Sequence, residues 1–269
     1  MKSLGIRSFS ATLFSLIALG AATLGVSRQA AAQELVLDGT FTSTNYISPQ
    51  PGNAVTASGG QLGYNLNATG WTNTSSGYNF LFVPGTADVT GANGVDGNLK
   101  LWGSHNSGLS TLTAPPGGGN FIAADGAYEV GAIQQTITGL TVGQEYTLSF
   151  YWGAAQQSGF TGNTTEKWTA SLGAQSFNTS TYSLPSHSFS GWMQQSFTYT
   201  ATSSSEVLSF LATGTPSGEP PFSLLADVSM QATSPSPAPE PSVLQYGAFL
   251  LAIPFLARAR RMFGKKSQA

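Results

Sequence analysis

The 269-residue chain contains no cysteine, so no disulfide holds it together. It has only two histidines, and neither a His-x-x-x-His pair nor a cysteine accompanies them, which excludes the common zinc sites. No Gly-x-Ser-x-Gly segment occurs, which excludes a serine hydrolase of the nucleophile-elbow type. Stability must therefore come from a buried apolar core.

Charged residues are also scarce, at 8% of the chain, and they are unevenly distributed. Lysine and arginine gather at the two ends, and only Lys100 and Lys167 lie between them. All 12 acidic residues lie between Glu34 and Glu240. The middle of the chain is therefore strongly negative, which disfavours binding to the phosphate backbone of nucleic acids.

The N-terminus has the layout of a cleaved secretory signal. Two basic residues precede a long apolar run, and a small-residue site with Ala30 and Ala32 follows it. Residues 1–32 are therefore expected to form a signal peptide that engages the Sec translocon and is removed by signal peptidase. An uncleaved anchor helix is the alternative, which the polar break at residues 27–29 disfavours.

The C-terminus carries a second apolar stretch, residues 243–257, behind the Pro-rich linker 233–242. As a helix it would reach roughly 22 Å, which is short of a hydrocarbon core of about 30 Å. A basic cluster follows the stretch, and such clusters stay on the cytoplasmic side of a membrane. The cluster includes Arg258, Arg260 and Arg261.

The order of features at this end is that of a known sorting signal. Pro239, Glu240 and Pro241, then the apolar stretch, then the basic cluster resemble the PEP-CTERM signal of Gram-negative bacteria. The resemblance implies a membrane-tethered intermediate, with residues 243–269 as a hydrophobic helix and basic tail. It also implies that an exosortase cuts near the Pro-Glu-Pro motif and delivers the domain to the cell surface or extracellular matrix. A plain single-span anchor is the alternative.

Between the two ends, the chain shows no sustained apolar pattern at helical spacing, and several short segments alternate with period two. In EYTLSFYW, four bulky side chains face one way, namely Tyr146, Leu148, Phe150 and Trp152. Clusters of Gly, Pro, Asn and Ser separate these segments. Residues 33–232 are therefore expected to form an all-β, antiparallel sandwich.

One stretch gives a more detailed expectation. In ITGLTVGQEYTLSF, two alternating segments flank a turn at Gly143. This pattern predicts a β-hairpin, with Leu140 in the core.

Five segments, taken in order, resemble the galactose-binding-like jelly rolls, which are similar in fold to carbohydrate-binding modules. They are LDGTFT, GGGNFIAADG, QTITGLTVGQEYTLSFYW, GWMQQSFTYTATSSSEVLSFLATGTP and PPFSLLADVSM. The resemblance implies that the first and last strands pair to close the sandwich. It also implies a structural calcium ion, held by an acid after the first-strand Gly-x-Phe and by an aspartate on the last strand. Asp227 matches the second position, but Thr42 stands at the first, so one oxygen ligand is missing. No other cofactor is expected.

The five tryptophans are the candidates for stacking on sugar rings. Trp152, Trp168 and Trp192 lie in or beside alternating segments and are expected in the core. The other two lie near polar loops, where core packing and ligand binding both stay open. The candidate binding residues are therefore Trp71 and Trp102, with Asn73, Asn106 and Gln156 as polar partners.

These observations lead to three hypotheses. The first is a non-catalytic cell-surface or matrix protein that binds polysaccharide or serves as a scaffold. The second is a glycoside hydrolase or lyase with Asp125 and Glu129 as paired carboxylates. The third is a purely structural surface protein without a small ligand.

Overall fold

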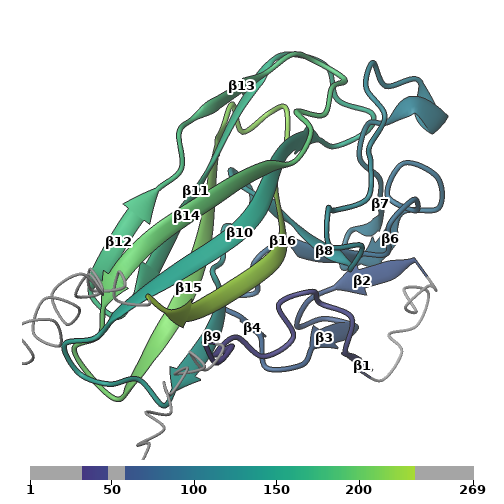
Figure 1. Ribbon diagram of the computed structural model, residues 1–269. Coiled ribbons are helices and arrows are strands. Elements are labelled where there is room, and N and C mark those ends of the chain that lie inside the picture. Colours follow the sequence, from purple (N-terminus) through teal and green to yellow (C-terminus); the bar gives the residue numbers. More distant parts are fainter. Residues whose placement is uncertain (1–31, 48–57, 234–269) are drawn as a thin grey trace, which may run out of the picture. The chain divides into compact units, whose positions relative to one another are not determined.

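A computed structural model of the protein describes residues 32–47 and 58–233 (Figure 1). Apart from Ala32, the predicted signal peptide lies outside the described residues. The predicted sorting motif at residues 239–241, the apolar stretch and the basic cluster lie outside them as well. The two predicted terminal helices therefore stay predictions. Within the described ranges, no helix is long and apolar enough to cross a membrane.

Two large sheets dominate the described chain, and almost all their strands run antiparallel. In spatial order, the first contains β14 (Met193–Thr200), β10 (Glu145–Gln156), β16 (Pro221–Ala232), β8 (Phe121–Asp125), β5 (Asn79–Phe82), β2 (Gly59–Gln61), β6 (Ala92–Gly94) and β7 (Gly97–Leu99). The second contains β12 (Gln175–Asn178), β11 (Thr164–Leu172), β15 (Ser205–Thr215), β9 (Ile133–Thr138) and β4 (Thr72–Asn73), and β13 (Tyr182–Leu184) also pairs with β11. The remaining elements are the pair β1 (Thr44–Tyr46) and β3 (Leu66–Ala68) and one 3₁₀ turn, η1 (Ser104–Asn106).

From β8 onward the chain passes back and forth between the two sheets (Figure 1). The order β8-β16-β10-β14 in one sheet faces β9-β15-β11-β12 in the other, which is the strand order of a jelly roll. The predicted antiparallel β-sandwich is therefore confirmed for the described residues. Strands β5, β2, β6 and β7 extend the first sheet beyond β8, and β2 and β6 form a parallel pair.

Period-two alternation explains the core between the sheets. The four bulky side chains of β10 that share a face are all at most 4% exposed, as predicted. On the facing sheet, Trp168 is fully buried, and its indole N–H donates to the carbonyl of Leu224 at 3.0 Å. This bond links β11 to β16 across the core. Trp152 and Trp168 are thus core residues, as expected.

A second apolar cluster covers part of the outer face of the first sheet. Side chains of β5, β8 and β16 that point away from the sandwich pack there against residues from β6 to Leu112. Trp192 is partly buried against this cluster. The covering layer reaches Ala155 near the end of β10, but it leaves Thr147, Ser149 and Tyr151 earlier in that strand partly exposed. One half of this face is therefore accessible.

Two local predictions are wrong. The stretch around Gly143 is not a hairpin, because β9 belongs to the second sheet and β10 to the first. Gly143 does lie in a turn and Leu140 is 4% exposed, but the turn carries the chain between sheets. The first-strand segment LDGTFT is a turn, with positive φ at Asp38 and Phe41. Alternation defines which face of a strand is buried, but not which strand it pairs with.

Candidate functional site

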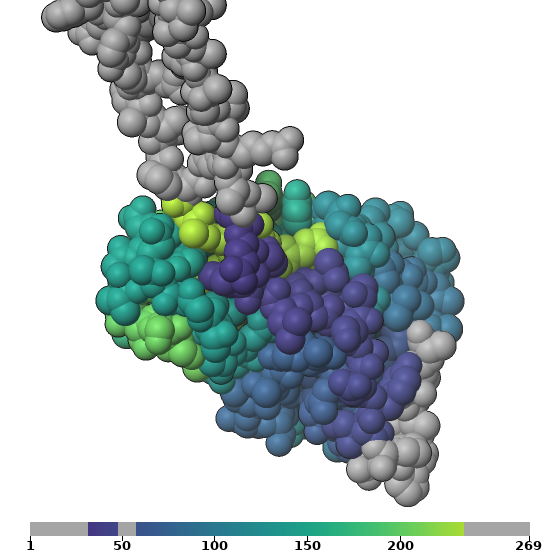
Figure 2. Space-filling view, turned by 60° about the horizontal axis from the view of Figure 1, so that its bottom comes forward, coloured from purple at the N-terminus to yellow at the C-terminus, as the bar shows by residue number. Residues whose placement is uncertain are grey.

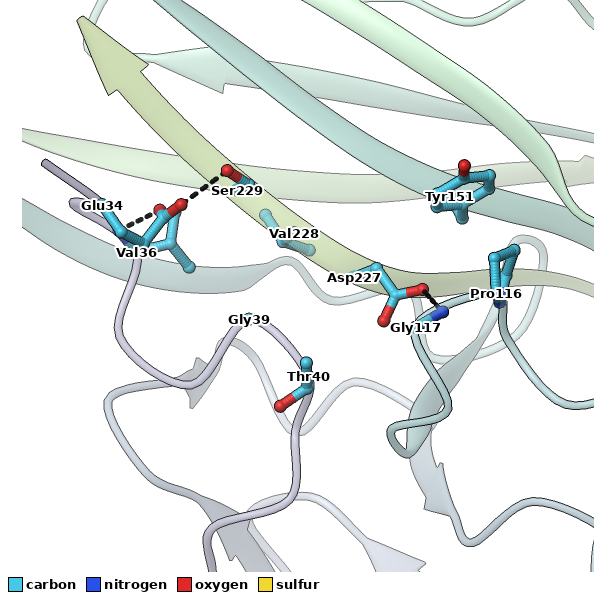
Figure 3. A pocket seen from close by; sticks show the side chains of 10 residues that line it. All are labelled: Glu34, Val36, Gly39, Thr40, Pro116, Gly117, Tyr151, Asp227, Val228 and Ser229. Carbon is cyan, nitrogen blue, oxygen red and sulfur yellow. Dashed lines mark hydrogen bonds between the residues drawn. The ribbon is translucent and has the colours of Figure 1, made fainter. Parts of the chain in front are cut away.

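The accessible half of the outer face is hollowed along β10 and β16. The larger hollow, of about 550 Å³, lies between the N-terminal segment, the loop at Pro116 and the bend of β16 (Figure 3). A second hollow of about 440 Å³ adjoins it at Ser229 and follows Thr147 and Ser149 along β10. We call the two together the β10–β16 groove. Each has the size of an ordinary ligand site, which spans about 300–1,000 Å³.

The N-terminal segment forms one wall of the groove. Figure 2 shows this purple segment against the yellow last strand. The Leu35 N–H donates to Met230 O at 3.0 Å, and the Val228 N–H donates to Gly39 O at 2.9 Å. These bonds take the place of strand pairing along β16, so a segment without strand geometry still borders the sheet.

Glu34 fastens the start of this wall. Its carboxylate accepts hydrogen bonds from the Ser229 hydroxyl at 2.5 Å and from the Met230 N–H at 2.8 Å. It also accepts the N–H groups of Leu35 and Val36, at 3.1 and 2.9 Å. A carboxylate that accepts these four hydrogen bonds stabilises the local fold and has few lone pairs left to accept a hydrogen bond from a ligand.

A bulge in β16 places Asp227 in the groove. The register with β10 shifts between Ser149 and Tyr151, so that Asp227 and Val228 stand opposite Phe150. Asp227 takes a left-handed conformation, with φ at 51°. Such bulges redirect a side chain from the regular pleat. Here the redirected side chain is a carboxylate that faces the groove (Figure 3).

The two oxygens of Asp227 differ in their surroundings. Oδ2 accepts a hydrogen bond from the Gly117 N–H at 2.7 Å. Oδ1 is buried and has no hydrogen-bond partner among the described residues. A side chain at Gly117 would come within 2.3 Å of this oxygen, so only glycine allows the contact. An unpaired buried oxygen is costly, and a ligand hydroxyl or cation would offset that cost.

Tyr151 supplies the aromatic surface of the groove. Its half-buried ring stands at one end, beside Pro116 (Figure 3). Tyr151 was not among the stacking residues predicted from the sequence, which were all tryptophans. The signal was nevertheless present, because Tyr151 is the one aromatic side chain on the polar face of the alternating segment EYTLSFYW.

The calcium expectation depends on what surrounds Asp227. Calcium takes six to eight oxygen ligands, and Oδ1 of Asp227 fits one of them. Asp38 is occupied elsewhere, since its carboxylate accepts the N–H groups of Thr42 and Ser43 at 2.9 and 3.1 Å. In the described ranges, no three His, Cys, Asp or Glu residues are grouped to hold a metal ion. Calcium binding at Asp227 stays a prediction.

Two of the five sequence candidates, Trp71 and Asn73, lie outside the β10–β16 groove. Trp71 is 4% exposed and packs against Phe41 and Phe210 in the main core. The Asn73 amide donates to Leu62 O and Gly77 O, at 2.8 and 2.7 Å. Polar neighbours in the sequence suggested a surface loop, but tertiary packing buries the ring. Trp71 is thus a core residue, and Asn73 holds a turn.

The other three candidates come together at one end of the sandwich. The Trp102 N–H donates to Gln156 O at 2.9 Å, and the Asn106 amide closes η1 through Leu101 O and the Gly103 N–H. Gln156 is fully buried, and its amide is bonded to Gly162 O and the His187 N–H. Only the partly exposed Trp102 ring is left as a ligand surface, and it packs against His187 with centroids 4.1 Å apart and ring planes tilted by 38°.

The two carboxylates of the enzyme hypothesis lie in different surroundings, one buried and one exposed. Asp125 is 2% exposed, and its Oδ1 accepts the N–H groups of Ala127 and Tyr128 at 2.8 and 3.0 Å. Burial raises its pKa to about 6, although these two bonds lower it. Glu129 lies exposed on the loop that follows. Asp125 therefore serves the turn, which does not support glycoside hydrolysis by this pair.

Comparisons with known proteins find several sugar-binding domains among the solved structures that are similar to this chain. No family model and no curated protein matches the chain. It is similar to the C-terminal domain of the sugar-binding protein EclA (21% identity, 36% of this chain, 64% of that one, TM-score 0.28). It is similar to TmCBM61 in complex with β-1,4-galactotriose (8% identity, 61% and 90%, TM-score 0.33). It is also similar to the CBM22-1 xylan-binding domain of Paenibacillus barcinonensis Xyn10C (10% identity, 77% and 98%, TM-score 0.34).

These similarities are weak in coverage and in structural overlap. The chain covers less than two thirds of the EclA domain, and each TM-score lies well below 0.5. They assign neither a ligand nor a residue role to this chain.

Proposed function

We propose that this protein binds neutral polysaccharide non-catalytically at the cell surface or in the extracellular matrix, through the β10–β16 groove. The observation that carries the proposal is the unpartnered, buried oxygen of Asp227 in a groove that also offers the ring of Tyr151. Sugars present both hydroxyl donors and apolar ring faces, and these two groups match them.

The shape and polarity of the groove also support a polymeric ligand. Ser229 belongs to both hollows, so the groove follows the strands further than a single pocket. The β10 side chains in it are two hydroxyls and a phenol. Among the described residues, the only charged side chains that line the groove are the carboxylates of Glu34 and Asp227. An elongated surface of hydroxyls with these two carboxylates suits a neutral chain of sugars better than an anionic polymer.

We also propose export and sorting by the two ends of the chain. The signal peptide would direct the chain through the Sec translocon, and an exosortase would cut near Pro239–Pro241. The support is the order of Pro-Glu-Pro, apolar stretch and basic cluster in the sequence. These segments lie outside the described residues.

Substitution of Tyr151 tests the groove. In calorimetric titrations of the full chain with soluble xylan, galactan and β-glucan, with calcium and with chelator, we expect one polymer to bind saturably. Tyr151→Ala is expected to weaken its binding about fivefold, because one stacked ring contributes on the order of 1 kcal/mol. Asp227→Asn is expected to weaken binding as well, since it replaces an acceptor oxygen with a donor.

Two controls make this result specific. Tyr46→Ala removes a tyrosine that is 68% exposed outside the groove and should bind like the wild type. Trp102→Ala tests the other exposed ring. If Trp102→Ala weakens binding and Tyr151→Ala does not, the groove is the wrong site. If the wild type binds none of the polymers, the binding function is contradicted.

Sorting is tested on the protein purified from its own bacterium. We expect mass spectrometry to find a mature chain that begins near Gln33 and ends near Pro239–Pro241. Replacing Pro239, Glu240 and Pro241 with alanine should preserve the C-terminal residues up to Ala269. A wild-type chain that still ends at Ala269 would instead support the single-span anchor.

A further inference from the structure

β14 is the long free edge of the first sheet. Within the described residues it pairs only with β10, and it lies at the end of the strand order. It has 8 residues, whereas the other end strands β7, β12 and β4 have 3, 4 and 2. Short edge strands are one device by which proteins avoid pairing with other chains. β14 lacks this device.

The sequence of β14 lacks the other protective devices as well. MQQSFTYT contains no charged residue and no proline, and its register with β10 runs without a bulge from Met193 to Thr200. Lysines, prolines and bulges on edge strands usually prevent association. An eight-residue edge without any of them is open to another strand.

The hydrogen bonds show which backbone groups reach this edge. The Ala201 N–H donates to Gln144 O at 2.9 Å, so Ala201 points towards β10. At the preceding residue, the Thr200 N–H and C=O point the other way and bond to the Gln175 side chain, at 3.1 and 2.6 Å. Because backbone direction alternates along a strand, every second residue of β14 directs its N–H and C=O to the edge. These residues are Gln194, Ser196 and Thr198.

Gln175 imitates a neighbouring strand at Thr200 and closes that end of the edge. Among residues 32–47 and 58–233, nothing else pairs with this edge apart from the side-chain amide of Gln195, which donates to Ser196 O at 3.1 Å. Beside it, Phe177 is 41% exposed and stacks on Phe197 with centroids 5.4 Å apart. An apolar ring next to unpaired backbone groups is a surface that association would bury.

We propose that β14 pairs antiparallel with β14 of a second copy of this chain, about a twofold axis at Ser196. An antiparallel edge is complementary to itself, and β14 carries no charge that would select a different partner or repel a copy. Ser196 then lies opposite Ser196 of the second copy, and Gln194 opposite Thr198. These three pairs form about six hydrogen bonds and end before the position that Gln175 occupies.

The pairing has a consequence for binding, which rests on the proposed function. Thr147, Ser149 and Tyr151 of β10 lie directly opposite Thr198, Ser196 and Gln194 of β14, so the groove and the edge share one sheet. A twofold axis perpendicular to the sheet places both grooves on the same face, with the two β10 strands about 15 Å apart. Such a dimer would bind one polymer at two places or join two polymers.

Sedimentation velocity of the full chain over a range of protein concentrations, in one mild detergent at a fixed detergent concentration, tests the pairing. We expect the wild type to show a monomer–dimer equilibrium. Ser196→Lys places two like charges opposite each other, and Thr198→Pro removes an edge N–H that β10 does not use. Each is expected to weaken dimerisation about tenfold or more. The matched control Thr136→Lys, exposed on the other sheet, should dimerise like the wild type.

The absence of cysteine allows a second test of register. Ser196→Cys should crosslink into covalent dimers with a short bismaleimide, whereas Thr136→Cys should stay monomeric under the same conditions. A wild type that is monomeric at every concentration overturns the proposal. Dimerisation that neither Ser196→Lys nor Thr198→Pro weakens also overturns it, because the contact then lies elsewhere.

Discussion

The Glu166→Gln variant is expected to be more stable than the wild type above pH 8, by about 5 kcal/mol at most. Glu166 lies on β11, faces the core and is fully buried. Its Oε1 accepts the Thr164 hydroxyl, and its Oε2 has no partner among the described residues. Burial therefore raises the pKa of Glu166 from 4.5 to about 8, although the bond from Thr164 lowers it.

The direction of the pH dependence follows from this shift. Between pH 4.5 and about 8, the folded state holds a proton on Glu166 that the unfolded state has lost. Raising the pH therefore lowers the free energy of unfolding by up to about 1.4 kcal/mol per unit. No cation offsets the charge, since the one ion pair among the described residues joins His105 to Asp88. The contribution is intact below pH 4.5 and lost above about 8.

Chemical unfolding at pH 5, 7 and 9, followed by tryptophan fluorescence, measures this effect. Glu166→Gln should exceed the wild type only slightly at pH 5 and increasingly at pH 7 and 9. The free energy of unfolding of Glu166→Gln is itself expected to fall by a smaller amount as the pH rises to about 6. The reason is that burial also raises the pKa of Asp125 from 3.8 to about 6. Glu129→Gln removes the same charge from an exposed side chain and should change little. Parallel pH curves for wild type and Glu166→Gln would contradict the prediction.

Gly39→Ala is expected to destabilise the protein by about 2–4 kcal/mol and to abolish binding in the groove. A methyl group at Gly39 would lie 1.8 Å from the carbonyl oxygen of Val228, which is far inside van der Waals contact. Backbone must then move, and the 2.9 Å bond from the Val228 N–H to Gly39 O is lost. The N-terminal wall of the groove separates from β16 next to Asp227.

The measurement combines unfolding with titration of the polymer that binds the wild type. Gly218→Ala is the matched control, because no atom lies within 4 Å of its added methyl group and its φ is not positive. It should unfold and bind like the wild type. Equal unfolding midpoints for the two variants would show that the N-terminal segment does not contact β16 closely in solution.

Only part of the site can be predicted from the sequence, and the different positions of Trp71 and Tyr151 show why. Trp71 lies among polar residues, yet its ring packs into the core because the chain folds back over it. Tyr151 lies in a strand that alternates clearly, and its exposure follows directly from the period. Local alternation thus places a side chain on a face, whereas a loop residue depends on contacts with distant segments.

The sequence by itself determined the strand pattern, the buried face of β10 and the lack of disulfides, because these depend on neighbouring residues and on composition. It also marked Asp227 on the last strand. Only the tertiary structure decided that β9 and β10 lie in different sheets, that a bulge turns Asp227 into the groove and that β14 is a free edge. These features arise from pairing between residues far apart in the chain, which no local period encodes.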